Sequence, residues 1–258
     1  METYRILPVR VGYLAHFEKS TFTYGRNAGE KIEAPCIVWV VTNGRRTVVV
    51  DAGPSAPERA RAYHPAYTCP PEEELGRALA AHGIDPEQVD TVVVSHLHWD
   101  HVGGMPVFPR ATFLVQRDEL FAACDPIATQ RVTYETGIRG LPPVWTSVFD
   151  RIQVCRGDFE LAPGLRVVRL PGHTPGLQGL LVDTEAGPAL IASDAVPLVD
   201  NWLGDAGLAH IPNGIHVDLS AYEETFAKME RLARWVLPGH DPAAFDGDRF
   251  PVESRRGS

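Results

Sequence analysis

The sequence has few cysteines, no long hydrophobic run and no excess of basic residues. Its four cysteines are scattered through 258 residues without a Cys-x-x-Cys pair, which argues against both a disulfide framework and a thiolate metal site. No apolar stretch approaches the roughly 20 residues that cross a bilayer, and the start of the chain has no basic segment before an apolar one. The net charge of −9 disfavours nucleic acid as a ligand, because binding phosphates requires clustered Lys and Arg. We therefore expect a cytoplasmic, unprocessed protein that acts on a small molecule.

The composition is that of a compact folded protein. With 44% hydrophobic and 22% charged residues, the chain can bury one substantial core. We expect a single domain over residues 1–252 and a disordered tail over residues 253–258. Either a monomer or a homodimer is compatible with this composition.

The most informative stretch holds three histidines and an aspartate within six consecutive positions, residues 96–101. His96, His98 and Asp100 alternate, so an extended or looped backbone would aim them the same way, whereas His101 breaks the alternation. Histidine and aspartate together suit a divalent ion such as zinc. One metal reached by His96 and His98 and a second reached by Asp100 and His101 is the simplest geometry for this pattern.

The surroundings of this stretch favour a metal site over a solvated histidine-rich loop. Residues 90–94 are rich in β-branched side chains and predict a buried strand, and the candidate ligands begin at its carboxyl end. Gly103 and Gly104 follow and permit a tight turn close to bound metals. A solvated loop would need neither the strand nor the glycines.

Three further candidate ligands each follow a predicted strand. They are His173 after residues 166–170, Asp194 after residues 189–193, and His240 after residues 235–237. Each alone is weak, since a lone His at such a place is usually structural and a lone Asp usually caps a turn. Together with the dense cluster they indicate a metal centre.

This order of ligands resembles the metallo-β-lactamase superfamily, over about residues 37–240. The resemblance implies an α+β fold, a four-layer αββα sandwich with the site at one edge between two β-sheets. It implies two zinc ions, although other divalent metals are possible, and the following set: His96, His98 and His173 on one metal, Asp100, His101 and His240 on the other, and Asp194 bridging them. The segment 48–53 also resembles an early motif of the superfamily, in which Asp51 would orient a ligand histidine rather than bind metal.

Such a centre supplies its own nucleophile. Two divalent ions that share a water lower its pKa from the bulk value toward or below ~7, so a bridging hydroxide is available at neutral pH. Asp100 would also carry a proton to the leaving group, and Asp100 and Asp194 are therefore the candidate catalytic residues. No Ser-His-Asp or Cys-His arrangement is apparent.

Within the superfamily the chain is most similar to the dizinc N-acyl-homoserine lactonases. The shared features are the seven ligands, the absence of a nuclease-type insertion, the Pro-Gly-His-Asp ending and the segment 22–25. The resemblance implies a zinc-dependent hydrolase that opens a lactone or a related ester, and hence quorum quenching. Pro197 is a departure, because those lactonases commonly place at this position a tyrosine that assists the carbonyl oxygen.

Three other functions stay open. A thioesterase of the glyoxalase II kind has the same ligands but usually a basic region near its end, and none follows His240. An iron-dependent redox enzyme on this scaffold tends to replace a histidine by a carboxylate and to carry a flavin domain. A metal-binding protein without catalysis is disfavoured, because an intact ligand set leaves room for a reactive water.

The loop after Asp194 is the candidate substrate wall, since long loops often carry binding residues. Trp202 and His216 are the candidate substrate-binding residues. The structural alternatives are that Trp202 packs under the loop and that His216 caps the next helix.

Local patterns predict the other elements. Residues 71–82 predict a helix that stops at Gly83, and residues 220–234 predict a helix opened by a capping box of Ser220 and Glu223. Residues 36–41 and 47–51 predict a hairpin through Asn43-Gly44, and residues 112–116 predict a strand. Tyr222, Phe226, Met229 and Ala233 form the expected core stripe of the second helix.

Overall fold

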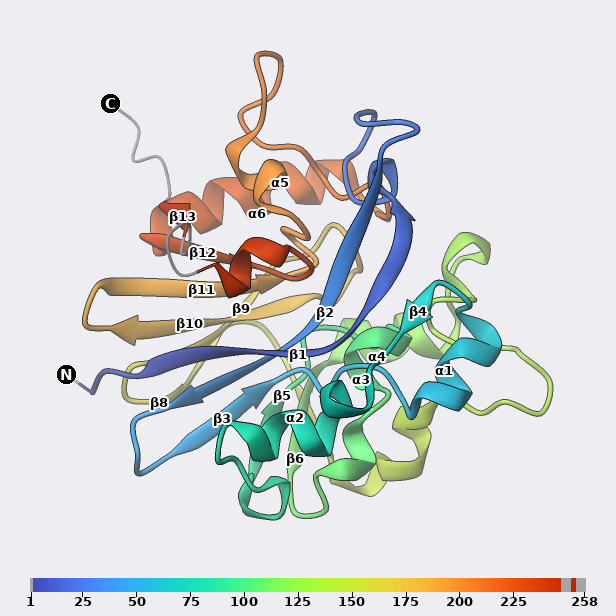
Figure 1. Cartoon of the computed structure of the whole chain (residues 1–258). Helices are drawn as coiled ribbons and strands as arrows, with labels where there is room; N and C mark the ends of the chain where they lie inside the picture. The colour runs from blue at the N-terminus through green and yellow to red at the C-terminus, as the bar shows by residue number, and fades with distance from the viewer. Residues whose placement is uncertain (1, 247–251, 254–258) are drawn as a thin grey trace. The chain divides into compact units, whose positions relative to one another are not determined.

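A computed structural model of this protein describes residues 2–246 and 252–253. The described chain forms two β-sheets together with several helices (Figure 1). The described chain forms two compact units. Unit 1 comprises residues 1–5, 16–34 and 157–258, and unit 2 comprises residues 6–15 and 35–156. The expectation of a single domain over residues 1–252 stays a prediction.

The first sheet has the strand order β4-β1-β2-β3-β5-β6-β7. Its strands are β1 Arg5–Glu18, β2 Lys31–Thr42, β3 Thr47–Val50, β4 Tyr67–Thr68, β5 Thr91–Val93, β6 Thr112–Gln116 and β7 Ile152–Cys155. The strands β3, β5, β6 and β7 run parallel. The valine-rich sequences of β3 and β5 suit burial on both faces, whereas β7 lies at the edge of the sheet and exposes Gln153 and Val154. The predicted hairpin is confirmed, because β2 and β3 pair antiparallel around the turn at Asn43.

The second sheet has the strand order β13-β12-β11-β10-β9-β8. Its strands are β8 Phe159–Ala162, β9 Leu165–Arg169, β10 Gln178–Thr184, β11 Gly187–Ser193, β12 Trp235–Pro238 and β13 Val252–Glu253. Only β11 and β12 pair in parallel among these strands. The strands expected before His173, Asp194 and His240 are thus present. Of the expected tail, Glu253 lies in β13, and residues 254–258 lie outside the described part of the chain.

The helices of unit 2 are short. They are α1 Pro57–Tyr63, α2 Leu75–Ala81, α3 Trp99–Val102 and α4 Arg117–Cys124. The single helix predicted over residues 71–82 is wrong in extent, because Glu74 has an extended backbone (ψ 132°) that separates a 3₁₀ turn at Pro71–Glu73 from α2. The buried side of α2 begins only at Leu75, so packing starts the helix there, and Gly83 ends it with a φ of 72°.

Short 3₁₀ segments connect many of these elements. They are η1 Lys19–Thr21, η2 Pro71–Glu73, η3 Pro86–Gln88, η4 Met105–Val107, η5 Ala128–Gln130, η6 Val144–Arg151 and η7 Pro242–Phe245. Several have proline at their first or second position, where its fixed φ is already suited to a helical turn.

The helices of unit 1 are α5 Val199–Leu203 and α6 Leu219–Leu232, and α6 packs along the second sheet (Figure 1). The predicted core stripe of α6 is confirmed, since Tyr222, Phe226 and Met229 are buried in one cluster with β9, β11 and β12 side chains. The predicted capping box is wrong. The helix begins at Leu219, and the carboxylate of Asp218 accepts the backbone N–H groups of Ser220 and Ala221 at 2.9 and 3.0 Å.

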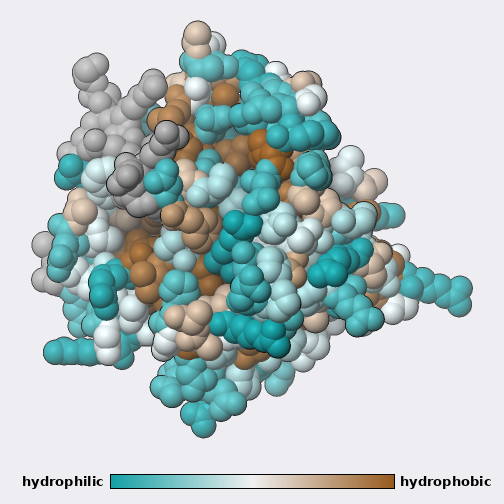
Figure 2. Space-filling model, in the orientation of Figure 1, coloured by the Kyte–Doolittle hydropathy of each residue, from teal (hydrophilic) through white to brown (hydrophobic). Residues whose placement is uncertain are grey.

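The surface is mainly polar where it can be seen. Figure 2 shows one face on which hydrophilic residues predominate and hydrophobic residues gather in small areas between them. Among the described residues, no helix has both the length and the apolar character required to cross a membrane.

The corrected cap leads to a stability prediction. Asp218→Ala should lower the free energy of unfolding by about 1 kcal/mol, because two N–H groups of the first turn of α6 lose their acceptor. Ser220→Ala is the matched control and should change it by less than about 0.5 kcal/mol. Denaturant unfolding followed by circular dichroism measures both, and a larger effect at Ser220 would restore the capping box.

Candidate metal centre

A buried carboxylate, that of Asp51, organises the histidine-rich segment of unit 2. Asp51 follows β3, is 2% exposed and has a φ of 65°, a conformation that is uncommon for residues other than glycine. Its Oδ1 accepts the backbone N–H of Ser95 at 2.7 Å. Its Oδ2 accepts the Ser95 hydroxyl and the Nδ1 of His101, both at 2.8 Å. Asp51 therefore contacts a candidate ligand histidine, as the sequence predicted.

These hydrogen bonds select the ring nitrogen that each histidine offers to a metal. The Nδ1–H of His101 donates to Asp51, so its Nε2 bears the lone pair in the neutral ring. Because the hydroxyl proton of Ser95 goes to Asp51, the Ser95 oxygen accepts from the Nδ1 of His96 at 2.9 Å. His96 therefore also presents Nε2. Both rings are held in the form that coordinates a metal.

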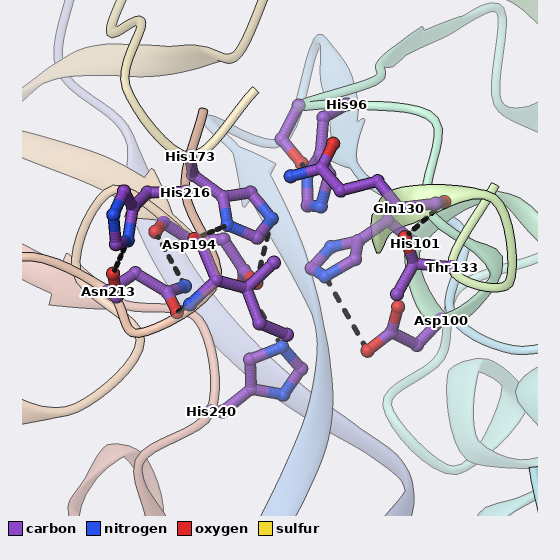
Figure 3. Close-up of polar contacts among 12 residues, drawn as sticks. His96, Asp100, His101, Gln130, Thr133, His173, Asp194, Asn213, His216 and His240 are labelled. Atoms are coloured by element: carbon purple, nitrogen blue, oxygen red, sulfur yellow. Dashed lines mark hydrogen bonds and ion pairs between the residues drawn. The ribbon is translucent and has the colours of Figure 1, made fainter. Parts of the chain in front are cut away.

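The candidate ligands of unit 2 lie close together. A ring nitrogen of His96 lies within 4.8 Å of one of His98 and of one of His101, and all three residues are at most 2% exposed. The Asp100 carboxylate lies 3.9 Å from the Nε2 of His101 and is more accessible, with 13% of its side chain exposed (Figure 3). Burial of several imidazoles beside a carboxylate is typical of a metal site.

The local backbone differs from the expected alternation. His98 is extended (φ −70°, ψ 152°), but α3 begins at Trp99, so Asp100 and His101 are presented by a helical turn. Gly103 and Gly104 also serve another purpose than expected. A Cβ at Gly103 would lie 2.0 Å from the backbone nitrogen of Ser55, and one at Gly104 would lie 2.2 Å from the carbonyl oxygen of Ala52. These glycines allow close packing against residues 52–55 rather than against metals.

Trp99 braces the short helix from its other side. Its ring stacks on that of His64, with centroids 3.8 Å apart and planes 5° apart. The Nε2 of His64 lies 3.3 Å from the Glu135 carboxylate, which also accepts from Arg59 at 2.8 Å. Burial alone would raise the pKa of Glu135, but the contacts with His64 and Arg59 outweigh it and lower that pKa. His64 thus helps to fix α3.

A cysteine lies near this cluster, although the sequence argued against a thiolate site. Cys36 in β2 is fully buried, and its sulfur lies within 4.8 Å of a carboxylate oxygen of Asp100. The spacing of cysteines along the chain carries no signal for this proximity, because it arises from the pairing of distant segments. All four cysteines are free thiols.

Unit 1 brings together the three isolated candidates of the sequence. The Nε2 of His173 lies 3.4 Å from Oδ2 of Asp194, and the Nε2 of His240 lies 3.1 Å from Oδ1 of the same carboxylate (Figure 3). The Nδ1–H of His173 donates to the carbonyl of Ile215 at 2.7 Å, which leaves the lone pair on Nε2. Each oxygen of Asp194 therefore faces a different histidine, the arrangement expected of a bridging carboxylate.

The sequence Pro-Gly-His occurs at residues 171–173 and again at 238–240. In both places a side chain at the glycine position would clash with a neighbouring group. A Cβ at Gly172, whose φ is 143°, would lie 2.5 Å from the ring of Tyr222, and a Cβ at Gly239 would lie 2.7 Å from the carboxylate of Asp194. Phe22, from the segment noted in the sequence, stacks on the ring of His240 with centroids 4.9 Å apart. Glycine and aromatic packing together place the candidate ligand histidines His173 and His240.

Two residues that the sequence did not assign to the site hold the backbone of Asp194. The hydroxyl of Tyr222 and the amide of Asn213 donate to the Asp194 carbonyl at 2.9 and 3.2 Å. Burial, with the charge of Asp194 adding to it, raises the pKa of Tyr222 well above its usual value, so this hydroxyl keeps its proton. Tyr222 was predicted only as part of a core stripe, and nothing local to Asn213 indicates its role.

The two expected substrate-binding residues lie in different environments. Trp202 is 2% exposed, stacks on His210 at 4.2 Å and belongs to the core cluster of unit 1. Its burial favours packing under the loop. His216 is half-buried, donates from Nδ1 to the carbonyl of Asn213 at 2.9 Å and meets the ring of Tyr24 edge-on. It does not cap α6, because Asp218 does.

The donors of both units fit divalent zinc. They are imidazole nitrogens and carboxylate oxygens, which zinc accepts together. The partners of His96, His101 and His173 on their Nδ1 atoms are the supports that metal-binding histidines usually have.

Comparison with known proteins agrees with this chemistry. Residues 33–240 match the Metallo-beta-lactamase superfamily. An N-acyl homoserine lactonase of Bacillus sp is 29% identical over 187 residues, which cover 72% of this chain and 65% of that protein. N-acyl homoserine lactonase AiiA of Bacillus thuringiensis subsp. kurstaki is 30% identical over 171 residues, covering 66% and 63%. The match thus spans slightly less than two thirds of the length of these relatives.

Solved structures show the same fold. A quorum-quenching N-acyl homoserine lactone lactonase superposes with a TM-score of 0.72 at 23% identity, over 94% of each chain. An AiiA variant of B. thuringiensis with N-decanoyl-L-homoserine bound superposes with a TM-score of 0.75 at 22% identity, over 98% of this chain and 100% of that chain. The predicted α+β fold of the metallo-β-lactamase type is confirmed. Because the family match covers well over half of the sequence, this protein belongs to the metallo-β-lactamase superfamily.

Proposed function

We propose that this protein is a dinuclear metal-dependent hydrolase that opens a lactone of the N-acyl-homoserine-lactone kind or a related ester. The observation that carries the proposal is the carboxylate of Asp194, whose two oxygens lie 3.4 and 3.1 Å from the Nε2 atoms of His173 and His240. A carboxylate placed in this way suits two metal ions rather than one. The relatives named N-acyl homoserine lactonases support the choice of a lactone.

The proposed metals are two zinc ions. His96, His98 and His173 would hold one ion, Asp100, His101 and His240 the other, and Asp194 would bridge them. When bound, the pair would make a hydroxide available near neutral pH and polarise the scissile carbonyl.

The protein groups would hold this centre in one geometry and move a proton. The contacts of Asp51 and Ser95 fix the orientation of the His96 and His101 rings, so little reorganisation is needed during the reaction. Asp100 is the more accessible carboxylate of unit 2. In this proposal it takes up the proton that the attacking hydroxide loses when its oxygen becomes part of the product carboxylate, and passes that proton to the alkoxide that leaves when the ring opens.

His216 is the proposed substrate contact. The side chain of Pro197 offers no hydroxyl to the substrate, so another polar group is needed to contact it. Because Nδ1–H of His216 donates to Asn213, its Nε2 would accept a hydrogen bond from the substrate. An N–H beside the lactone ring, as in an N-acyl-homoserine lactone, is a suitable donor. The nearly complete burial of Trp202 removes it from the proposed wall. We also propose that the enzyme is cytoplasmic and either monomeric or homodimeric.

Loss of a ligand should empty the centre. His98→Ala and Asp194→Ala are each expected to reduce bound zinc from about two ions per chain and to lower lactone hydrolysis by more than about 100-fold, because a ligand loss exceeds the usual effect of losing a supporting residue. Elemental analysis and initial rates measure both quantities. His82→Ala, at an exposed position, is the matched control. Full zinc content and full activity in either ligand variant would refute the assignment.

Asp51 should tune the affinity of the centre without binding metal. Asp51→Asn is expected to weaken zinc binding by about 10–100-fold, because an amide supports His101 less well than a carboxylate does. Competition with a chromogenic chelator measures the change, and Asp90→Asn, an exposed change at the start of β5, is its control. Equal affinity in Asp51→Asn and the unchanged protein would contradict the supporting role.

The substrate class can be tested directly. Zinc-loaded protein should have its highest kcat/KM on a lactone in a panel of N-acyl-homoserine lactones, simple γ- and δ-lactones, aryl esters, thioesters and β-lactams. The bridging centre and the relatives both favour this result. A preference for thioesters of about tenfold, or 1.4 kcal/mol in transition-state binding, would instead support the thioesterase. Bound iron with visible absorption would support the redox alternative.

A further inference from the structure

We propose that Glu119 is a positioning residue for the metal ligand His98, acting through Leu97 and Tyr134. This inference rests on the ligand role of His98 in the proposed function. Glu119, Thr133 and Tyr134 are here called the His98 bracket. All three belong to unit 2, as His98 does.

The side chain of Glu119 is a buried carboxylate that accepts two hydrogen bonds. It lies in the first turn of α4, directly after β6, and is 1% exposed. Its Oε1 accepts the backbone N–H of Leu97 and the hydroxyl of Tyr134, both at 2.9 Å. Burying a carboxylate is costly unless hydrogen bonds compensate, so both donors must stay in place. The position of Glu119 is thereby coupled to the backbone next to His98.

The backbone is held on both sides of His98. On one side Leu97, fully buried, donates its N–H to Glu119. On the other side Trp99 donates its N–H to the carbonyl of Thr133 at 2.8 Å. Since the residues before and after His98 are both anchored, the backbone dihedral angles that aim its side chain are restricted.

The imidazole itself is restricted by Tyr134. The two rings meet edge to face, with centroids 4.5 Å apart and planes at 73°. Tyr134 is 1% exposed, and its hydroxyl is tied to Glu119. A single carboxylate thus holds the chain beside His98 and the ring that limits its rotation. No local pattern in residues 117–124 or 130–134 signals this arrangement, because the contacts join segments 15 and 22 residues apart.

Loss of this bracket would weaken metal binding. A metal ligand must be held close to its productive geometry, within about 0.5 Å, for full affinity. Loss of a supporting partner typically weakens metal binding about 10–100-fold. The conservative change Glu119→Gln keeps an oxygen that can accept from both donors, whereas Glu119→Ala removes it.

The test compares zinc affinity in four purified proteins: unchanged, Glu119→Ala, Glu119→Gln and Thr136→Val. Thr136 lies in the same segment, and its hydroxyl donates to the backbone carbonyls of Ala123 at 2.7 Å and Tyr134 at 3.3 Å. Thr136→Val loosens this segment but leaves both contacts of Glu119 in place, so it is a control for general loosening. Chelator competition should show zinc binding weakened about 10–100-fold in Glu119→Ala and nearly normal in the other two. The absorption spectrum of the cobalt-substituted protein should change only in Glu119→Ala.

Unchanged zinc affinity and cobalt spectrum in folded Glu119→Ala would overturn the positioning role, as would an equal loss in Thr136→Val. Should Glu119→Ala fail to fold, Tyr134→Leu, which removes the ring beside His98, is judged by the same two measurements. The imidazole NMR signals of His98 in metal-free protein separate this inference from the proposed function. If the unchanged protein binds no zinc, the hydrolase proposal fails. The positioning role then stands if Glu119→Ala alone broadens those signals, and fails if it does not.

Discussion

The hydrogen bonds to the buried carboxylate of Asp51 are the constraint on which the histidine-rich segment depends. A carboxylate that is 2% exposed requires donors, and here they are the backbone and hydroxyl of Ser95 and the ring of His101. β3 and β5 are parallel neighbours, so Asp51 and Ser95 emerge at the same edge of the sheet. Asp51 adopts its unusual positive φ in the conformation in which its side chain accepts from all three donors.

Hydrogen bonds from neighbouring residues also orient the candidate ligands of unit 1. There the carbonyl of Ile215 orients the ring of His173, and the backbone of Asp194 is held by Tyr222 and Asn213. In both units the ring nitrogen away from the partner bears the lone pair, which is the form that binds a metal. Glycine is required where the Tyr222 ring and the Asp194 carboxylate approach the backbone. In each unit, the backbone conformation next to the candidate ligands is explained by the hydrogen bonds and close approaches of neighbouring residues.

Membership in the metallo-β-lactamase superfamily gives these clusters a chemical context. The proposed hydrolase would need no side-chain nucleophile, so the groups of the protein would mainly hold ligands and transfer a proton. The bracket around His98 and the brace on Trp99 fit this requirement, because both immobilise the segment that carries four of the seven candidate ligands. Pro197 leaves the recognition of the substrate to other groups, of which His216 is the proposed one.

Local chemistry made much of this protein readable from its sequence. The strand Thr112–Gln116 is as predicted, and the candidate ligands follow strands because alternation and turn residues are encoded over a few neighbouring positions. The sequence by itself thus determined the strands that precede the candidate ligands, the family and the candidate ligands, whereas the helical turn that presents Asp100 and His101 differs from the expected alternation. Tertiary structure decided the cap at Asp218, the break at Glu74, the burial of Trp202 and the role of Glu119. These features depend on which distant segments pack together, and no short stretch of sequence encodes that.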